Sequence, residues 1–236
     1  LNVGFVIDEG HASGIDNVFD IKISERKPIQ IKISAKGFCA HGSHLNAHNA
    51  IHDLISFLHT LNTMHENNKQ RLLYTDAGKL LSLHVTSLQA GIKKQDGSIT
   101  YNMIPDHAEA TMDIRVPPTM KNKDVMQLLL DTIKQYPSLS LHVIAQADEE
   151  PLYSEKTGYL YAMMQKAIES LGYKAQPHYF EASSDLRFYL NQGIESIGIT
   201  PFTCRDAIHE TNESVPIAQL IQARILFTQF LKNICS

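Results

Sequence analysis

Residues 107–116 alternate strictly between apolar and polar side chains. A period of two residues is typical of a β-strand with one buried face and one polar face. Residues 29–36 repeat the pattern, and Gly37 ends that strand. Two half-buried strands require a sheet whose apolar face is covered by other elements. The buried positions predicted from the two strands are Ile29, Ile31, Ile33, Ala35, Ala108, Ala110, Met112, Ile114 and Val116.

Two segments predict the helices that cover this sheet. Asn46 is placed to cap a helix whose apolar residues recur at helical spacing as far as residue 61. Asn122 is placed to cap a second helix that runs to residue 133 and is closed by Pro137. Further strands are expected at about 80–90, where Leu81, Leu83 and Val85 alternate, and at 139–145. The order is β-α-β-β-α-β, a ferredoxin-like arrangement with both helices on one face of an antiparallel sheet, spanning about residues 28–147.

The remaining segments predict a second, discontinuous domain. Residues 1–27 hold one or two strands, residues 155–171 an amphipathic helix, residues 194–199 a buried strand, and residues 216–234 a last helix. Strands that alternate with helices indicate an α/β layer. The predicted fold class is therefore an α/β domain, made of residues 1–27 and 148–236, interrupted by an α+β lid domain at residues 28–147.

Composition limits the partners that we expect. A net charge of −4 does not supply the basic surface that nonspecific nucleic-acid binding needs. No apolar run approaches the roughly 18 residues of a membrane span. The cysteines Cys39, Cys204 and Cys235 are far apart and form no CxxC pair, which is typical of reduced thiols. We expect no nucleic-acid partner, no membrane and a cytoplasmic location.

The first residues favour a chain with preceding sequence. Leu1 is not a methionine, and residues 3–7 already have the apolar pattern of a buried strand. A strand needs neighbours, so we expect a missing amino-terminal portion. A processed product, a fragment and one half of a split protein are all consistent with this pattern.

Two polar motifs flank the lid. Asp8 and Glu9 end an apolar strand just before Gly10, and ligands gather at the carboxyl ends of strands in α/β sheets. His209 stands before the last helix, from where a histidine can reach a cleft. Taken alone, the first motif is also consistent with a solvated turn, and the second with a structural histidine.

Histidines that follow the first lid strand suggest further sites. Small residues around His41 would let it approach a ligand closely, and a nucleophilic pair with Cys39 is a remote alternative. His48 and His52 have the i, i+4 spacing of zinc helices. No glutamate lies between that pair, so a polar helix face is the favoured interpretation.

Two arginines have the chemistry to bind a carboxylate. Arg115 stands on the polar face of its strand, after the segment 101–105 that contains Asn102. A guanidinium group binds a carboxylate through two parallel hydrogen bonds. Arg187 follows the polar loop 182–185, for which a helix cap is the competing interpretation.

Together and in this order, these motifs resemble the zinc-dependent aminoacylase and carboxypeptidase family, whose members have a dinuclear site and an inserted dimerisation lid. The resemblance extends over the whole chain. The motifs that carry it are Phe5–Gly10, Ser24–Arg26, Gly37–Ser43, Asn102–Pro105, Asp113–Arg115, Ser184–Phe188 and His209–Val215.

The resemblance implies a role for each candidate residue. Glu9 and His209 would each bind one of two zinc ions. His41 would cross the twofold axis of a homodimer, formed through the lid, to polarise the scissile carbonyl of the partner's substrate. Asn102 and Arg115 would bind the substrate from the lid, with Arg115 on its carboxylate. Arg187 is a further candidate in the substrate pocket.

This chain lacks several of the residues that form the metal site in the family. The family's first histidine ligand, its bridging aspartate and its adjacent pair of glutamates have no match here. A catalytic zinc keeps about three protein ligands and an open position for water. Glu9 and His209 would give one ligand per metal, so we expect this chain alone to be inactive.

The activity implied by the resemblance is the release of an amino acid from an N-acyl amino acid. The motif Ser24-Glu25-Arg26 resembles the aminoacylases, whereas the sequence around His209 is closer to the carboxypeptidase and desuccinylase branches. A carboxypeptidase or dipeptidase, a desuccinylase and a noncatalytic dimerising relative remain alternatives. The expected substrates are small N-acyl amino acids or dipeptides.

Overall fold

The structure is a computed structural model that describes residues 3–69, 78–147, 158–202 and 211–235. The chain divides into two compact units. The first consists of Leu1–Arg26, Ala77–Lys79 and Glu149–Ser236, and the second consists of Lys27–Asp76 and Leu80–Asp148. Each unit is described by itself.

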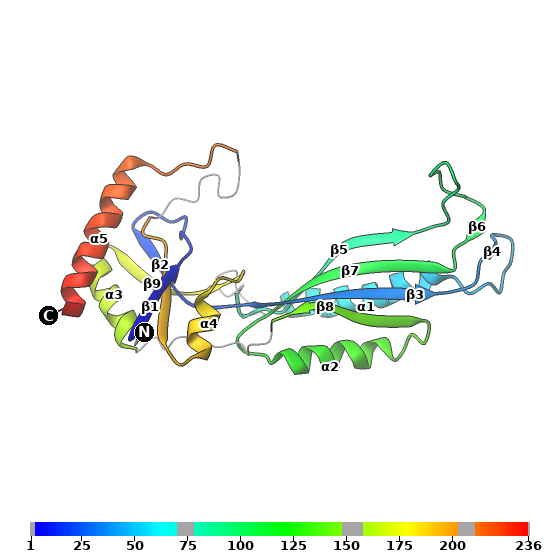
Figure 1. Cartoon of the computed structure of the whole chain (residues 1–236), viewed down its shortest axis with the longest axis horizontal. Coiled ribbons are helices and arrows are strands. Elements are labelled where there is room, and N and C mark those ends of the chain that lie inside the picture. The colour runs from blue at the N-terminus through cyan, green and yellow to red at the C-terminus, as the bar shows by residue number, and fades with distance from the viewer. Residues whose placement is uncertain (1–2, 70–77, 148–157, 203–210, 236) are drawn as a thin grey trace. The chain divides into compact units, whose positions relative to one another are not determined.

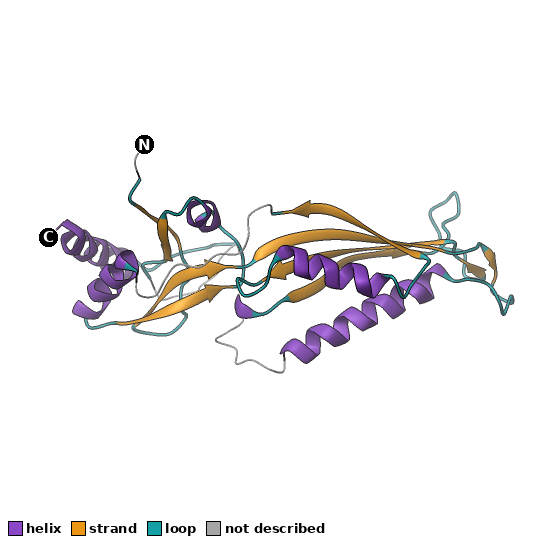
Figure 2. Ribbon diagram, turned by 90° about the horizontal axis from the view of Figure 1, so that it is seen from below, coloured by secondary structure: helices purple, strands orange, loops and turns teal. Residues whose placement is uncertain are grey.

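The second unit is an antiparallel sheet with two helices on one face. Its strands have the spatial order β5-β7-β3-β8, and Figure 2 shows both helices on the same side of them. The predicted βαββαβ order is confirmed. The elements are β3 (Lys27–Lys36), α1 (Ala50–Lys69), β5 (Ser82–Ala90), β7 (His107–Val116), α2 (Asn122–Ile133) and β8 (Leu139–Gln146), with a short ribbon of β4 (Ala40–His41) and β6 (Met103–Ile104) beyond the sheet (Figure 1).

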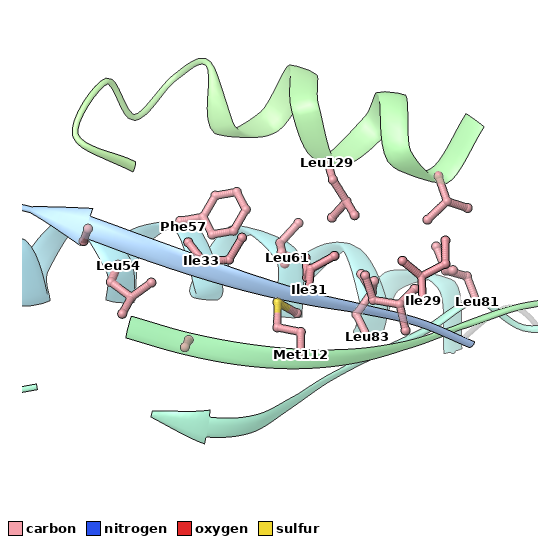
Figure 3. Packing of buried hydrophobic residues seen from close by; sticks show 14 of the residues in the cluster. Ile29, Ile31, Ile33, Leu54, Phe57, Leu61, Leu81, Leu83, Met112 and Leu129 are labelled. Carbon is pink, nitrogen blue, oxygen red and sulfur yellow. The ribbon is translucent and has the colours of Figure 1, made fainter. Parts of the chain in front are cut away.

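The core of this unit is built from the alternating residues of its two central strands. Ile31 of β3 lies opposite Met112 of β7, and both side chains are buried. Phe57 of α1 and Leu129 of α2 close over them from the helical layer (Figure 3). Burying a side chain of this size contributes roughly 1.5–3 kcal/mol, so the alternating pattern fixes which face of each strand turns inward.

The helix caps differ from the sequence prediction. Helix α1 begins at Ala50, and the side chain of Asn49, not of Asn46, accepts a hydrogen bond from the Ile51 N–H at 2.9 Å. Asn122 does not cap α2 either. Its side chain lies buried and donates to the Ala147 carbonyl at 3.0 Å, which ties the start of the helix to the chain after β8. A polar residue that precedes a helical pattern is thus not always the residue whose side chain reaches the first turn.

The outer strands of this sheet are less regular than predicted. A register shift between Val85 and Ser87 interrupts the pairing of β5 with β7, and Val85 is exposed. On β8, Leu139 and Leu141 are partly buried, while Val143 is exposed. Both strands lie at edges of the sheet, where only part of each predicted apolar face meets the helices.

The first unit is a mixed sheet with helices packed against it. Its spatial strand order is β1-β10-β2-β9; β1 and β10 are parallel, β10 and β2 antiparallel, and β2 and β9 parallel. The elements are β1 (Phe5–Glu9), β2 (Val18–Glu25), α3 (Tyr159–Ser170), β9 (Lys174–Phe180), α4 (Leu186–Asn191), β10 (Glu195–Ile199) and α5 (Ile217–Cys235). The buried core joins residues of β2, β10, α3 and α5.

Strand β9 was not predicted from the sequence. It contains Pro177, which removes a backbone donor, and it is an outer strand of the described sheet, a place where proline is tolerated. Among the helices that the structure describes, none has the length and apolar character to cross a membrane.

Candidate functional site

The two carboxylates at the end of β1 point to different environments. Successive side chains of a strand face opposite sides of the sheet. Asp8 turns toward Lys22 on β2, whereas Glu9 is exposed. Gly10 follows in close contact with β10, because a Cβ atom there would overlap the backbone of Ile199 and Thr200. At the end of this strand, Glu9 therefore faces solvent, whereas Asp8 contacts Lys22 inside the unit.

Asp8 belongs to a buried polar cluster centred on Ser184. The hydroxyl of Ser184 lies 2.6 Å from Asp8 Oδ2 and 2.7 Å from Glu25 Oε2, and it accepts a hydrogen bond of 2.6 Å from Lys22 Nζ. The ammonium group of Lys22 is also 3.4 Å from Asp8 and 3.8 Å from Glu25. Lys22 is fully buried and Glu25 is 2% exposed, so the charges compensate one another away from solvent.

Arg187 completes the same cluster. Its Nη1 donates to Glu25 Oε1 at 3.3 Å and to the Ser184 carbonyl. Burial raises the pKa of Glu25 above its ordinary value, although the Ser184 hydroxyl and the Lys22 ammonium both act to lower it. The guanidinium group of Arg187 is thus engaged inside the protein, and its predicted role in binding a substrate remains a prediction.

The ribbon of β4 and β6 brings His41 and Asn102 together. The strands pair with His41 opposite Met103, and Gly42 N–H donates to the Asn102 carbonyl at 2.7 Å. The Asn102 amide nitrogen lies 3.3 Å from His41 Nε2. Both residues are exposed at the end of the sheet where β3 finishes and β7 begins (Figure 1).

Local hydrogen bonds define the tautomer of His41. The Ser43 N–H lies 3.3 Å from His41 Nδ1, and the Ser43 hydroxyl lies 2.8 Å from the same atom. A backbone N–H can only donate, so Nδ1 accepts and a neutral ring carries its proton on Nε2. A proton on Nε2 requires the carboxamide of Asn102 to be reversed, so that its oxygen and not its nitrogen faces Nε2. His41 therefore offers an N–H donor at an exposed edge.

Arg115 lies far from that pair within the same unit. It stands opposite Pro28 at the start of β3, and its Nε donates to Asp113 Oδ2 at 2.7 Å on the same face of β7. His41 and Asn102 lie beyond the other end of the two strands. At about 3.3 Å per residue, the length of β7 separates Arg115 from them by roughly 26 Å. A single small substrate cannot touch both ends of one lid.

Two alternative sites from the sequence are not supported by the geometry. His48 precedes α1 instead of lying within it, and its Nε2 pairs with Asp53 Oδ2 at 2.9 Å, so the helical zinc pair with His52 is wrong. His41 Nδ1 is bonded to Ser43, and no contact orients it toward Cys39 in the described parts of the chain.

The expected pair of zinc ligands is not assembled by the described residues. Glu9 is exposed at the end of β1, while His209 falls outside the described residues. Carboxylates nearby do not substitute for it, since Asp8 and Glu25 are held by Lys22 and Ser184. The residues present therefore do not complete a catalytic metal site, and no metal-dependent step is assigned to them.

Several polar residues with close contacts were not singled out from the sequence. Lys22 lies on the buried strand β2, where a lysine among apolar residues indicates an internal charge partner. His11 lies beside His178 and Glu181 in the first unit, although it is far from them in the sequence. Only the tertiary structure brings His11 to the other two residues.

Comparisons with known proteins agree with this architecture. Residues 23–138 match the M20 family model that is described as a peptidase dimerisation domain. Aminoacylase-1 of Dictyostelium discoideum is 27% identical over 246 residues, covering 99% of this chain and 59% of that protein. Aminoacylase-1A of Rattus norvegicus is 25% identical over 242 residues, covering 100% of this chain and 57% of that protein. Residues 23–138 belong to the M20 peptidase dimerisation domain family.

Solved peptidase structures share the fold of this chain. An M20 metallo-carboxypeptidase from Sulfolobus solfataricus superposes with a TM-score of 0.73 at 15% identity, covering 98% of this chain and 64% of that one. A tripeptidase from Staphylococcus aureus gives a TM-score of 0.72 at 16% identity, covering 98% of this chain and 57% of that one. The present chain thus spans less than two thirds of the length of each of these relatives.

Proposed function

We propose that this chain is part of an M20 hydrolase that releases an amino acid from an N-acyl amino acid. Support comes from the aminoacylases of Dictyostelium discoideum and Rattus norvegicus, which match nearly the whole of this chain. Their names describe the same reaction class that the motif Ser24-Glu25-Arg26 favours. A zinc-dependent, cytoplasmic enzyme is part of this proposal.

The observation that carries the proposal is the spacing of the lid residues. Arg115 provides a guanidinium group beside Asp113, and its terminal nitrogens make no hydrogen bond within the described residues. We assign it to the substrate carboxylate, which it can bind through two parallel bonds. His41, with its proton on Nε2, suits a carbonyl oxygen that gains negative charge during the reaction.

The separation of these two groups requires a second lid. Because roughly 26 Å of sheet lies between Arg115 and His41, one chain cannot supply both to a substrate as short as an N-acyl amino acid. A twofold dimer solves this problem, since each lid can then give Arg115 to its own site and His41 to the partner's. Asn102 contacts His41 and would travel with it to the partner's site.

Glu9 and His209 are proposed to be metal ligands in the complete enzyme. Zinc would polarise the substrate carbonyl and activate water there. The remaining ligands and the general base are absent from this chain. We therefore expect the chain alone to be inactive, and a protein that also carries those groups to be active.

Subunit complementation tests the proposal directly. In a complete enzyme, His41→Ala and Arg115→Ala homodimers should each be nearly inactive toward N-acyl amino acids. Dissociating and reassociating an equal mixture should restore about a quarter of the wild-type activity, because half of the dimers are mixed and each has one intact site. The matched control is a mixture of His41→Ala with Asn102→Ala, which should restore little, since both changes damage the same contributed edge.

The outcomes separate the proposal from its alternatives. Absence of recovery in the first mixture would show that the two residues do not come from different subunits. Hydrolysis of dipeptides instead would indicate a carboxypeptidase or dipeptidase, and hydrolysis of N-succinyl substrates alone would indicate a desuccinylase. A complete protein that binds no zinc and cleaves none of these substrates would be a noncatalytic dimerising relative.

A further inference from the structure

Three side chains of the first unit converge on one point away from the lid residues. His11 follows Gly10 after β1, His178 lies on β9, and Glu181 follows that strand. One nitrogen of each histidine and one carboxylate oxygen all lie within 4.8 Å of one another. Within the described ranges, this is the group of three potential metal ligands that the structure brings together.

The two imidazole rings are held in a fixed orientation. His11 and His178 stack with ring centroids 4.8 Å apart and an angle of 7° between the planes. Phe180 packs against both rings, at 5.7 Å from His11 and 6.3 Å from His178. This apolar wall limits rotation of the rings, so the nitrogen atoms are presented from a preorganised surface.

A buried carboxylate orients His178 from behind. Asp20 is 3% exposed, and its Oδ2 lies 3.6 Å from His178 Nδ1. The other oxygen of Asp20 accepts a hydrogen bond of 2.8 Å from Gln176 Nε2, which fixes the carboxylate. A carboxylate beside Nδ1 favours a proton on that nitrogen, which would leave the lone pair of Nε2 for a metal ion.

The other ring nitrogen of His178, Nε2, faces the carboxylate of Glu181. This nitrogen is buried and lies 3.4 Å from Glu181 Oε2. This separation lets the two atoms share one cation, either a proton or a metal ion.

We propose that His11, His178 and Glu181 bind a divalent transition-metal ion, for which zinc is the best match. Two imidazole nitrogens and one carboxylate oxygen form a ligand set that zinc uses, with water in the fourth position. Zinc–ligand bonds of about 2.0–2.2 Å place tetrahedral ligand atoms about 3.3 Å apart. The three ligand atoms lie within 4.8 Å of one another, so an ion would have to draw them closer together. Glu181 has 37% of its side chain exposed, which leaves an entry path for the ion and its water.

The site uses neither Glu9 nor His209, so it stands or fails independently of the proposed catalytic function. Asp20 is assigned as a positioning residue for His178. Its loss is expected to weaken metal binding without removing a ligand, by about 10–100-fold.

The test is metal binding by the full 236-residue chain. Chain freed of metal with EDTA is titrated with Zn²⁺ by calorimetry and with Co²⁺ by visible absorption, which reports tetrahedral coordination. We expect one ion per chain for this site, and at least about tenfold weaker binding after His178→Ala, His11→Ala or Glu181→Gln. Asp20→Asn should show an intermediate loss. The matched control is His142→Ala, since His142 is an exposed histidine on β8 and should leave binding unchanged.

The outcomes are distinct. Absence of Zn²⁺ binding at micromolar concentration overturns the proposal and identifies a proton as the cation between His178 and Glu181. Binding that survives all three ligand variants also overturns it. Loss of binding through Glu9→Gln alone would assign the ion to Glu9 instead. Circular dichroism of each metal-free variant shows whether it folds. If a histidine variant does not fold, Glu181→Gln provides the test, because it keeps the size of a partly exposed side chain.

Discussion

The buried ammonium group of Lys22 gives the sharpest test of how the first unit is held together. Lys22→Met keeps the length of the side chain and removes its charge. The change leaves Glu25, which is 2% exposed, and Asp8 without their shared cation. Breaking one side of a buried ion pair costs about 3–5 kcal/mol.

The structure places the expected loss at the lower end of that range. Arg187 remains 3.3 Å from Glu25, and the side chain of Asp8 is 15% exposed, so neither carboxylate is fully stranded. We expect the free energy of unfolding to fall by about 3 kcal/mol at pH 8, which is roughly a 150-fold change in the folding equilibrium.

The loss should depend on pH with a defined sign. The pKa of Glu25 in the folded chain is already above its unfolded value of 4.5, and Lys22 is one of the groups that lower it. Without Lys22 the folded pKa rises further. A raised carboxyl pKa favours folding below pH 4.5 and loses that contribution as the pH rises through the folded pKa. The deficit of Lys22→Met should therefore be smallest near pH 4.5 and largest at pH 8.

Urea unfolding followed by circular dichroism, at both pH values, measures these differences. Lys32→Met is the matched control, because Lys32 pairs with Glu109 at 3.1 Å but is 40% exposed, and it should cost below about 1 kcal/mol. The double variant Lys22→Met/Glu25→Gln should recover part of the loss by removing the stranded charge. A deficit below about 1 kcal/mol at pH 8, or an equal deficit at both pH values, would refute the reasoning.

Three further predictions concern local geometry, and each can be measured by thermal or urea unfolding. Asn49→Ala should cost about 1 kcal/mol because it removes the cap of α1, whereas Asn46→Ala should cost almost nothing; equal effects would contradict the observed cap. Gly198→Ala should prevent stable folding of the first unit, because its Cβ would overlap the chain of the buried lysine, while Gly4→Ala, with open space around it, should be tolerated. Phe57→Ala should cost about 3–5 kcal/mol through the cavity that it leaves in the lid core, and a loss below about 1 kcal/mol would show that the core collapses around it.

The lid could be predicted from sequence because its pattern is local and redundant. Strands β3 and β7 alternate along their full length, and the buried face that they predict is the one observed. Details that depend on the path of a loop could not be predicted. Asn46 and Asn49 both precede the helical pattern, and only the conformation of residues 46–50 decides which side chain reaches the first turn.

The candidate site was predictable only where strand pairing brings its members together. His41 follows β3 and Asn102 precedes β7, so the pairing of those strands places them at one end. The cluster around Ser184 joins residues far apart in the chain, and no periodic pattern in the sequence predicts it. Similarly, β9 carries Pro177 and several polar residues, so its role as a strand, and with it the position of His178, follows from tertiary contacts alone.

The discontinuity of the first unit has a consequence for the order of events during translation. Strand β1 pairs with β10, and the whole lid is encoded between them. On a ribosome, residues 27–148 are complete and able to fold before β10 has been made. Until then, Phe19, Ile21 and Ile23 of β2 have no finished sheet to join. This apolar segment therefore lacks its sheet partner until β10 has been synthesised, and a chaperone could bind it during that interval.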